Sequence, residues 1–407
     1  MSAEPQRIIR QTTQTASDTQ LPVAKPYSIM LVAGEASGDM HAATMVKTLR
    51  QQHGEQAFAF KGMGSTQLKA CGIDLLVDSS DIAVMGIVEV ISHYPKIRRA
   101  MRRLQQELRV SPPDLLILID YQEFNFRLAA FAKRQGIKVL FYVSPQVWAW
   151  RPGRVKKIGQ IIDMMAVIFP FETRYYEAEQ IPVRYVGHPL ANKVKPMMSK
   201  EQAQSMFSLN PTLPTIAVMP GSRMSEVTRL LPVLLKTISL IRKKLHDAQF
   251  ILPVAGNLNR GEIERVVNDS RLPIIVIQGA TYDAINVADH VILASGTATL
   301  EVACLYKPMT VIYKISPITY HLVKKLVNIS HFSLVNIVSQ KEVVKEFIQD
   351  RAQPYLIAND ALNLLEDDTR RDQMIEQLQH VADLLNQGDS AANVANLAMD
   401  MLQTQTP

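Results

Sequence analysis

Residues 290–301, His-Val-Ile-Leu-Ala-Ser-Gly-Thr-Ala-Thr-Leu-Glu, are the stretch that decides the fold. The apolar run over 291–294 predicts a buried strand. After a break at 295–297, apolar residues recur at helical spacing, so the strand feeds a helix through a tight turn. This strand-turn-helix unit is typical of α/β folds with parallel sheets.

The turn at 295–297 is also a candidate phosphate site. The first helical turn presents free N–H groups and the positive end of the helix dipole, and a glycine lets a ligand approach the backbone. One turn deeper, a carboxylate is placed to bind the hydroxyls of a ribose. The candidate residues are Ser295, Gly296, Thr297 and Glu301. The alternative is an ordinary helix capped by its serine and threonine side chains.

The same pattern recurs through both halves of the chain. Further strands are predicted over residues 28–33, 114–120, 138–145, 164–169, 216–219, 250–255, 274–277 and 309–313. Such apolar strands need a parallel sheet that is covered on both faces. The chain has 407 residues, more than one core usually serves. We therefore predict an α/β protein in which two doubly wound, Rossmann-like domains face a cleft.

The expected organisation has five parts. They are a disordered tail over 1–25, an N-terminal domain over 26–190, a linker over 191–211, a C-terminal domain over 212–385 and a helix over 386–407. The last helix is a packing element, a return to the first domain or a candidate surface for a homodimer, and its residues do not decide among these.

Composition narrows the class of protein. A hydrophobic content of 47% and a charged content of 20% fit a folded globular chain, and a net charge of +6 suits nucleic acid, an anionic membrane or phosphorylated substrates. No RNA-binding signature or zinc finger is present, so no nucleic-acid partner is expected. Cys71 and Cys304 lie in apolar helical patterns, which favours reduced thiols and a cytoplasmic protein. No apolar stretch reaches the ~20 residues that span a bilayer.

A second candidate anion site follows the strand at 216–219. Gly221, Ser222 and Arg223 precede a helix, and Glu226 comes three residues later. Backbone donors, a hydroxyl and a guanidinium at a helix start suit a diphosphate, and two such turns in one domain would flank a single nucleotide. The alternative is a capping motif with a surface arginine.

Carboxylates follow two strands of the first domain. Asp120 ends a buried strand, and a carboxylate at the carboxyl edge of a sheet is a natural general base for a hydroxyl. Glu123 lies three residues later, and the equivalent turn after the first strand contains Glu35, Ser37 and Asp39. These residues are candidates for the first-domain side of the cleft, with helix capping as the competing interpretation.

Several motifs are absent from the sequence. No H-E-x-x-H, D-x-D or His/Cys cluster appears, so neither a metal nor another cofactor is expected. The chain also lacks a G-x-G-x-x-G fingerprint, a Walker A lysine and a G-x-S-x-G elbow, which argues against NAD, an ATP-type loop and an α/β-hydrolase.

Residues 82–104 join an unusually apolar segment to a basic helix. This pattern is typical of an interfacial helix attracted to anionic lipid, although an ordinary surface helix with a solvated arginine face is the alternative. The candidate lipid contacts are Val84, Met85, Ile87, Val88, Arg98, Arg99, Met101, Arg102 and Arg103.

Five stretches, in order along the chain, together resemble the lipid-A-disaccharide synthase family. They are Gly-Glu-Ala-Ser-Gly-Asp at 34–39, Val-Met-Gly-Ile-Val-Glu-Val at 84–90, Tyr-Val-Ser-Pro-Gln-Val-Trp-Ala-Trp at 142–150, Pro-Gly-Ser-Arg at 220–223 and Ala-Ser-Gly-Thr-Ala-Thr-Leu-Glu at 294–301. The first three are specific to that family rather than to glycosyltransferases at large.

The resemblance implies a glycosyltransferase of the B type, peripheral on the cytoplasmic face of the inner membrane. It implies inverting transfer of 2,3-diacylglucosamine from UDP-2,3-diacylglucosamine to the 6-hydroxyl of 2,3-diacylglucosamine 1-phosphate, with loss of UDP, in lipopolysaccharide biosynthesis. The family's base corresponds to Asp120, and its nucleotide-binding positions correspond to Arg223, Ser295, Gly296, Thr297, Glu301 and Asn336.

Two departures from the family pattern concern the loops. Gln122 and Glu123 stand where the family usually has a proline and an aspartate, and Val335 replaces the proline before Asn336. Two other functions fit the same architecture. One is a UDP-sugar epimerase, which needs no lipid patch, and the other is a nucleotide- or lipid-binding module without catalysis.

Overall fold

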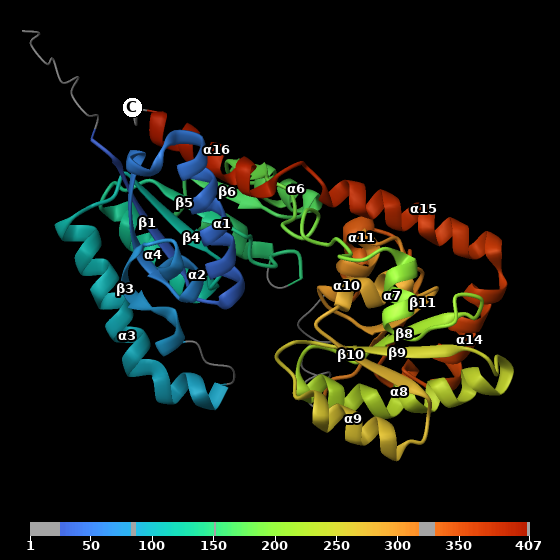
Figure 1. Ribbon diagram of the computed structural model, residues 1–407. Coiled ribbons are helices and arrows are strands. Elements are labelled where there is room, and N and C mark those ends of the chain that lie inside the picture. Colours follow the sequence, from blue (N-terminus) through green and yellow to red (C-terminus); the bar gives the residue numbers. More distant parts are fainter. Residues whose placement is uncertain (1–24, 83–86, 150–151, 317–329, 405–407) are drawn as a thin grey trace, which may run out of the picture.

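The computed structural model describes residues 25–82, 87–149, 152–316 and 330–404, and these form two lobes (Figure 1). The first lobe contains a seven-stranded sheet with strand order β3-β2-β1-β4-β5-β6-β7. Its strands are β1 (Tyr27–Ala33), β2 (Phe58–Gly64), β3 (Asp74–Asp78), β4 (Leu115–Ile119), β5 (Val139–Tyr142), β6 (Met164–Val167) and β7 (Val183–Tyr185).

The second lobe contains a six-stranded sheet with strand order β10-β9-β8-β11-β12-β13. Its strands are β8 (Thr215–Met219), β9 (Gln249–Val254), β10 (Ile274–Gln278), β11 (His290–Ala294), β12 (Met309–Tyr313) and β13 (Glu346–Ile348). All recorded strand pairs in both sheets are parallel. The strand order reverses between β1 and β4 and again between β8 and β11. In doubly wound sheets, ligands bind at the carboxyl ends of the strands beside such a switch point.

Helices cover both faces of each sheet, as a parallel sheet requires. Those before the linker are α1 (Ala36–His53), α2 (Thr66–Ala70), α3 (Ile87–Val110), α4 (Gln122–Arg134), α5 (Val155–Gly159) and α6 (Thr173–Glu177). Those after it are α7 (Lys200–Met206), α8 (Met224–Lys244), α9 (Arg260–Asp269), α10 (Thr281–Val287), α11 (Ala298–Cys304), α13 (Leu334–Ser339), α14 (Pro354–Glu366), α15 (Asp368–Leu385) and α16 (Ser390–Gln403). No helix among these is long and apolar enough to cross a membrane.

The alternation of side chains along each strand explains how helices pack on both faces of a sheet. On β1, Ile29 and Leu31 pack into the apolar cluster that contains α1, whereas Met30 and Val32 pack into the cluster that contains α3 and α4. Successive side chains of a strand point to opposite faces, so an all-apolar strand is buried on both sides. Each fully buried side chain of this kind contributes roughly 1.5–3 kcal/mol.

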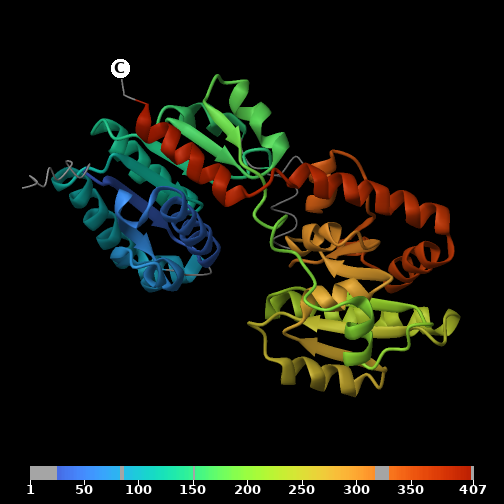
Figure 2. The ribbon, with the colours of Figure 1, turned by 45° about the horizontal axis from the view of Figure 1, so that its top comes forward.

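The end of the chain connects the two lobes. Helix α15 packs on the second lobe, and α16 returns to lie along α1 of the first lobe (Figure 2). Val394, Leu397 and Ala398 of α16 are buried in the same apolar cluster as α1. Of the three possibilities for the last helix, the structure therefore shows a return to the first lobe, and this buried face is not available to a partner chain.

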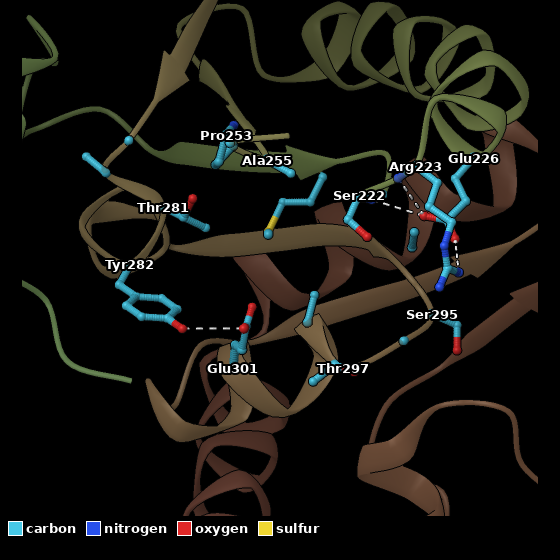
Figure 3. A pocket seen from close by; sticks show the side chains of 18 of the residues that line it. Ser222, Arg223, Glu226, Pro253, Ala255, Thr281, Tyr282, Ser295, Thr297 and Glu301 are labelled. Carbon is cyan, nitrogen blue, oxygen red and sulfur yellow. Dashed lines mark hydrogen bonds and ion pairs between the residues drawn. The ribbon is translucent and has the colours of Figure 1, made fainter. Parts of the chain in front are cut away.

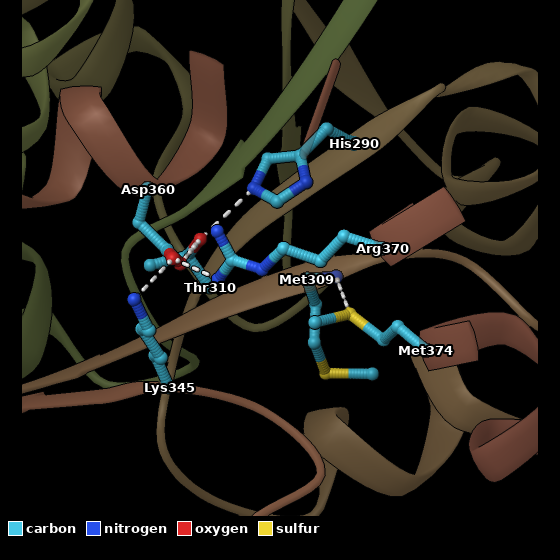
Figure 4. Close-up of polar contacts among 7 residues, drawn as sticks. All are labelled: His290, Met309, Thr310, Lys345, Asp360, Arg370 and Met374. Atoms are coloured by element: carbon cyan, nitrogen blue, oxygen red, sulfur yellow. Dashed lines mark hydrogen bonds and ion pairs between the residues drawn. The ribbon is translucent and has the colours of Figure 1, made fainter. Parts of the chain in front are cut away.

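A buried polar cluster lies at the amino ends of β11 and β12 (Figure 4). Thr310 donates its hydroxyl hydrogen to Oδ2 of Asp360 at 2.8 Å, so its oxygen accepts from Nε2 of His290 at 3.0 Å. Arg370 and Lys345 compensate the charge of Asp360, at 2.7 Å and 3.5 Å. This arrangement leaves Nδ1 of His290 unprotonated, and it has no hydrogen-bond partner in the described chain.

This histidine is expected to make the protein less stable in acid. Burial lowers the pKa of His290 from 6.5 to about 4, although Asp360 opposes the shift. Between these two values the unfolded chain binds a proton that the folded chain does not, so the free energy of unfolding falls as the pH falls. The loss attributable to His290 is roughly 3 kcal/mol.

Urea unfolding of the native protein and of His290→Gln at pH 7, 5.5 and 4.5 measures this loss. His41 and His188 also have lowered pKa values, but they titrate in both proteins, so the difference between the two curves isolates His290. If the free energy of unfolding falls equally with pH in both proteins, His290 is not a source of acid sensitivity.

Candidate functional site

A pocket of about 780 Å³ lies at the carboxyl ends of the strands of the second lobe (Figure 3). Ligand pockets usually have volumes of about 300–1,000 Å³. The pocket is lined by the turns that follow β8, β9, β10 and β11, and it contains Gly221, Ser222, Arg223, Ser295, Gly296, Thr297 and Glu301. The structure thus brings the two phosphate-type turns predicted from the sequence into one cavity.

The turn after β8 is held by an internal carboxylate. Oε2 of Glu226 accepts hydrogen bonds from the backbone N–H groups of Ser222 at 3.0 Å and Arg223 at 3.3 Å. Gly221 has φ +122°, and a Cβ there would lie 2.3 Å from Oε2 of Glu226, so only glycine fits. The capping interpretation is correct for this backbone, because its donors are already used. The Arg223 side chain is 68% exposed, with one contact to Glu226 at 3.3 Å.

The turn after β11 has free backbone donors. Within the described residues, the N–H groups of Gly296 and Thr297 have no hydrogen-bond partner, whereas the Ser295 hydroxyl donates to the carbonyl of Phe332 at 2.9 Å. No side chain caps α11. This helix has only seven residues, so the two open N–H groups matter more than its dipole. They suit an anionic oxygen that enters the pocket.

Glu301 lies at the other end of the pocket from Arg223 (Figure 3). Its Oε1 accepts a hydrogen bond from the Tyr282 hydroxyl at 3.4 Å. Burial raises the pKa of Glu301, and burial together with the Glu301 charge raises the pKa of Tyr282 to about 12. A carboxylate at this depth can accept from two neighbouring hydroxyls of a ligand. The sequence pattern gave no indication of Tyr282, which is the second residue of α10.

Asn336 does not reach the pocket. It is fully buried on α13, where its amide donates to the Val344 carbonyl and to Glu346, both at 2.8 Å, and its oxygen accepts from the N–H groups of Val343 and Val344. Because its amide and its oxygen are already hydrogen-bonded within the protein, Asn336 does not make the expected contact with the nucleotide. Glu346 also accepts from the backbone N–H of Phe332. Asn336 therefore helps to position, through Glu346, the loop whose Phe332 carbonyl accepts from Ser295.

In the first lobe, Asp120 lies in a strained turn directly after β4. Asp120 and Tyr121 have φ values of 50° and 45°, and such left-handed residues cost about 1 kcal/mol or more each. The turn is fixed by Asn125, whose amide donates to the Asp120 carbonyl at 2.7 Å. It is also fixed by Gly34, where a Cβ would lie 2.2 Å from the Tyr121 ring. The N-cap residue of α4 is Tyr121, whose side chain makes no capping hydrogen bond, and its backbone N–H donates to the Asp120 carboxylate.

The two lobes interact electrostatically at this point. Burial raises the pKa of Glu35, the Asp120 charge raises it further, and Arg223 of the second lobe lowers it. Burial also raises the pKa of Asp120. Glu35 is therefore within electrostatic range of both Asp120 and Arg223. Ser37 is exposed in the first turn of α1, beside Glu35.

Two other carboxylates from the sequence prediction have structural contacts. Asp39 is 1% exposed and accepts from Ser65 and Gln67 at the start of α2, at 2.7–2.8 Å. It therefore caps α2 and does not face the cleft. Glu123 is an exposed residue of α4 whose carboxylate pairs with Arg154 at 2.7 Å, so it already has a partner within the first lobe.

The basic segment forms the outer part of α3. Val84 and Met85 lie outside the described residues, and Ile87 and Val88 belong to the first turn of α3. Met101 is half-buried against the core of the first sheet; since its side chain packs inward, we no longer place it at a lipid surface. The arginines are exposed, and a small cavity of about 320 Å³ is lined by Tyr94, Pro95, Arg98, Arg99 and Arg102.

Comparison with known proteins identifies a family. Residues 29–399 match the model of the family described as lipid-A-disaccharide synthetase. The lipid-A-disaccharide synthase of Geobacter sulfurreducens is 44% identical over 93% of this chain and 98% of its own length. The enzyme of the same name from Nitrosococcus oceani is 43% identical over 92% of this chain and 96% of its own length.

Solved structures show the same fold at low identity. A co-structure of S. aureus MnaA with UDP has a TM-score of 0.61 at 12% identity and covers 94% of this chain and 99% of its own. The calicheamicin glycosyltransferase CalG4 has a TM-score of 0.60 at 13% identity and covers 94% of this chain and 100% of its own. The predicted α/β fold of the glycosyltransferase B type is thus confirmed.

Proposed function

Because the chain belongs to the lipid-A-disaccharide synthase family, we propose that the space between its lobes carries out that family's reaction with the residues described above. The enzyme is a glycosyltransferase. It transfers 2,3-diacylglucosamine from its UDP derivative to the 6-hydroxyl of 2,3-diacylglucosamine 1-phosphate, and it releases UDP and the β-1,6-linked disaccharide 1-phosphate.

The second lobe binds the UDP part of the donor. Glu301 accepts hydrogen bonds from the ribose hydroxyls, and the diphosphate contacts the free N–H groups of Gly296 and Thr297. Glu226 already occupies the N–H groups of Ser222 and Arg223. From that turn we therefore assign the Arg223 guanidinium, rather than the backbone, to the diphosphate.

The first lobe supplies the general base. Asp120 accepts the proton of the acceptor's 6-hydroxyl, the oxygen attacks the anomeric carbon of the donor, and the bond from that carbon to the UDP oxygen breaks with its electron pair leaving on UDP. Arg223 and the amides after β11 stabilise the charge that develops on the leaving group. Attack from the face opposite UDP inverts the anomeric carbon.

One observation carries this assignment above the others. The Asp120 charge on its own lobe raises the pKa of Glu35, and the Arg223 charge on the other lobe lowers it. Both charges are therefore within electrostatic range of Glu35, an arrangement that suits an in-line displacement between the two substrates.

A direct assay tests the function. Purified protein is mixed with UDP-2,3-diacylglucosamine and radiolabelled 2,3-diacylglucosamine 1-phosphate in detergent, and the lipid products are separated. We expect a slower-migrating disaccharide 1-phosphate and one UDP for each disaccharide formed. UDP release without disaccharide, or epimerisation of an acyl-free UDP-sugar, would contradict the proposal.

We further propose that α3 contacts an anionic membrane and that the enzyme is peripheral on the cytoplasmic face of the inner membrane. Arg98, Arg99, Arg102 and Arg103 are exposed on α3. Three of them line the small cavity with Tyr94, which offers guanidinium groups to a lipid phosphate. The acyl chains of both substrates make such a surface useful.

The double variant Arg98→Ala/Arg102→Ala is expected to bind anionic vesicles about 30-fold more weakly at low salt, at ~1 kcal/mol per arginine. Lys243→Ala/Lys244→Ala removes the same charge from exposed positions of α8 and should leave vesicle binding within a factor of about two. Vesicle sedimentation measures both. Equal losses for the two double variants would mean that net charge, rather than α3, governs binding.

A further inference from the structure

We propose that a cavity at the amino ends of the second sheet binds a small carboxylate with an apolar body. The cavity has a volume of about 480 Å³, and ligand pockets usually have about 300–1,000 Å³. Pro214, Asp289 and Pro308 line it and directly precede β8, β11 and β12. It shares no lining residue with the nucleotide pocket, which lies at the carboxyl ends of the same sheet. The inference is therefore independent of the proposed function.

Most of the cavity wall is apolar. Leu213 comes from the segment before β8, Tyr306 from the turn between α11 and β12, and Leu365 and Ile375 from α14 and α15. None of these four side chains is fully buried, so each leaves apolar surface in contact with solvent. Covering such surface is favourable, and a ligand with an apolar body would do so.

One residue of the wall has a strained backbone. Tyr306 has φ 56°, a left-handed conformation that glycine usually adopts at the end of a helix. The turn is closed by the N–H groups of Tyr306 and Lys307, which donate to carbonyls of α11 at 2.9 and 3.2 Å. A tyrosine is less stable here than a glycine, yet it lines the cavity and is 43% exposed. A strained residue beside a cavity points to a use for its side chain.

One cation of the cavity has no counter-ion. Arg371 pairs with Asp368 at 2.6 Å. The two oxygens of Asp289 contact the Lys200 ammonium at 3.6 Å and a backbone N–H at 2.9 Å. Within the part of the chain that the structure describes, no ion pair includes the ammonium of Lys307. The cavity therefore has one uncompensated positive charge.

The environment of Lys307 indicates the charge of the ligand. Burial lowers the pKa of Lys307 to about 8, the Lys200 charge adds to the shift, and Asp289 opposes it. The ammonium is still mostly protonated at pH 7, and an anionic oxygen would replace the water that burial has removed. A carboxylate brings one negative charge, whereas a phosphomonoester brings nearly two. One uncompensated cation therefore favours a carboxylate.

The test uses 4-phenylbutyrate and its neutral amide, 4-phenylbutyramide, as probes. Each is titrated into the full-length protein with and without excess UDP, and the methyl signals of Leu213, Leu365 and Ile375 are followed by NMR. We expect both probes to shift these signals. The carboxylate should bind about tenfold more tightly than the amide, the contribution of one charge-assisted hydrogen bond. UDP should not displace either probe.

Three variants separate the contributions of charge and wall. Lys307→Met keeps an unbranched side chain without its charge and should remove the preference for the carboxylate. Tyr306→Gly relieves the left-handed backbone and removes part of the wall, so it should weaken both probes by a similar factor. Lys236→Met removes an exposed amine of α8 that does not line the cavity and should preserve the preference.

Several results would overturn the carboxylate site. They are equal affinities of the two probes for the native protein, equal effects of Lys307→Met and Lys236→Met, and signal changes that spare the three methyl-bearing residues or disappear with UDP. If Lys307→Met no longer binds the neutral amide, the cavity itself has changed, and Lys307→Gln is measured in its place with the same expected loss of preference.

Discussion

Asp120→Ala is expected to lower kcat by about 10²–10⁴-fold, the usual contribution of a general base, while the affinity for UDP changes little. The carboxylate follows the end of β4, and burial raises its pKa although the Tyr121 backbone N–H opposes the shift. Since UDP binds on the other lobe, removal of the base should not weaken it. Steady-state turnover and calorimetric titration with UDP measure the two quantities.

Glu35→Gln is the matched control for this experiment. Glu35 is the neighbouring carboxylate, with a pKa that is also raised by burial. If Asp120 is the base, Glu35→Gln should cost far less activity than Asp120→Asn. A larger loss at Glu35 would move the base to the end of β1 and would remove Asp120 from the mechanism.

Arg223→Ala is expected to weaken UDP binding by about 1–3 kcal/mol, or roughly 5–150-fold. The guanidinium is mostly exposed and has one contact, to Glu226 at 3.3 Å, so it is available to a diphosphate. The effect should shrink as salt is raised, because exposed charges are screened. Calorimetric titration with UDP at two salt concentrations measures it.

Arg265→Ala is the control for charge alone. Arg265 is an exposed arginine of α9, and no pocket contact involves it. Its replacement should leave UDP affinity within a factor of about two. If both arginine variants bind UDP as the native protein does, the diphosphate does not contact Arg223.

Much of the fold could be predicted from strand periodicity. The interior strands β1, β4, β8, β9, β11 and β12 are continuous apolar runs, and the structure places each within one or two residues of the predicted range. The shorter strands β3, β7 and β13 contain only three to five residues that are mostly half-buried, so their patterns resemble loops. The strand predicted over 138–145 ends at Tyr142, because Val143 has φ 70° and leaves the sheet.

The candidate site could be predicted where its residues follow a strand end. Asp120, Arg223 and Ser295 depend only on local sequence, since the carboxyl ends of parallel strands meet at one edge. Asp39 and Asn336 depend on partners that local sequence does not reveal. The N–H groups that Asp39 caps lie 26 to 28 residues away, and Asn336 is enclosed by the segment at 343–346.

A crystal structure of the protein with UDP tests the central assignment most directly. We expect the ribose hydroxyls within hydrogen-bond distance of Glu301, and the diphosphate against the N–H groups of Gly296 and Thr297 with Arg223 beside it. UDP bound outside this pocket, or in it with the ribose away from Glu301, would contradict the account.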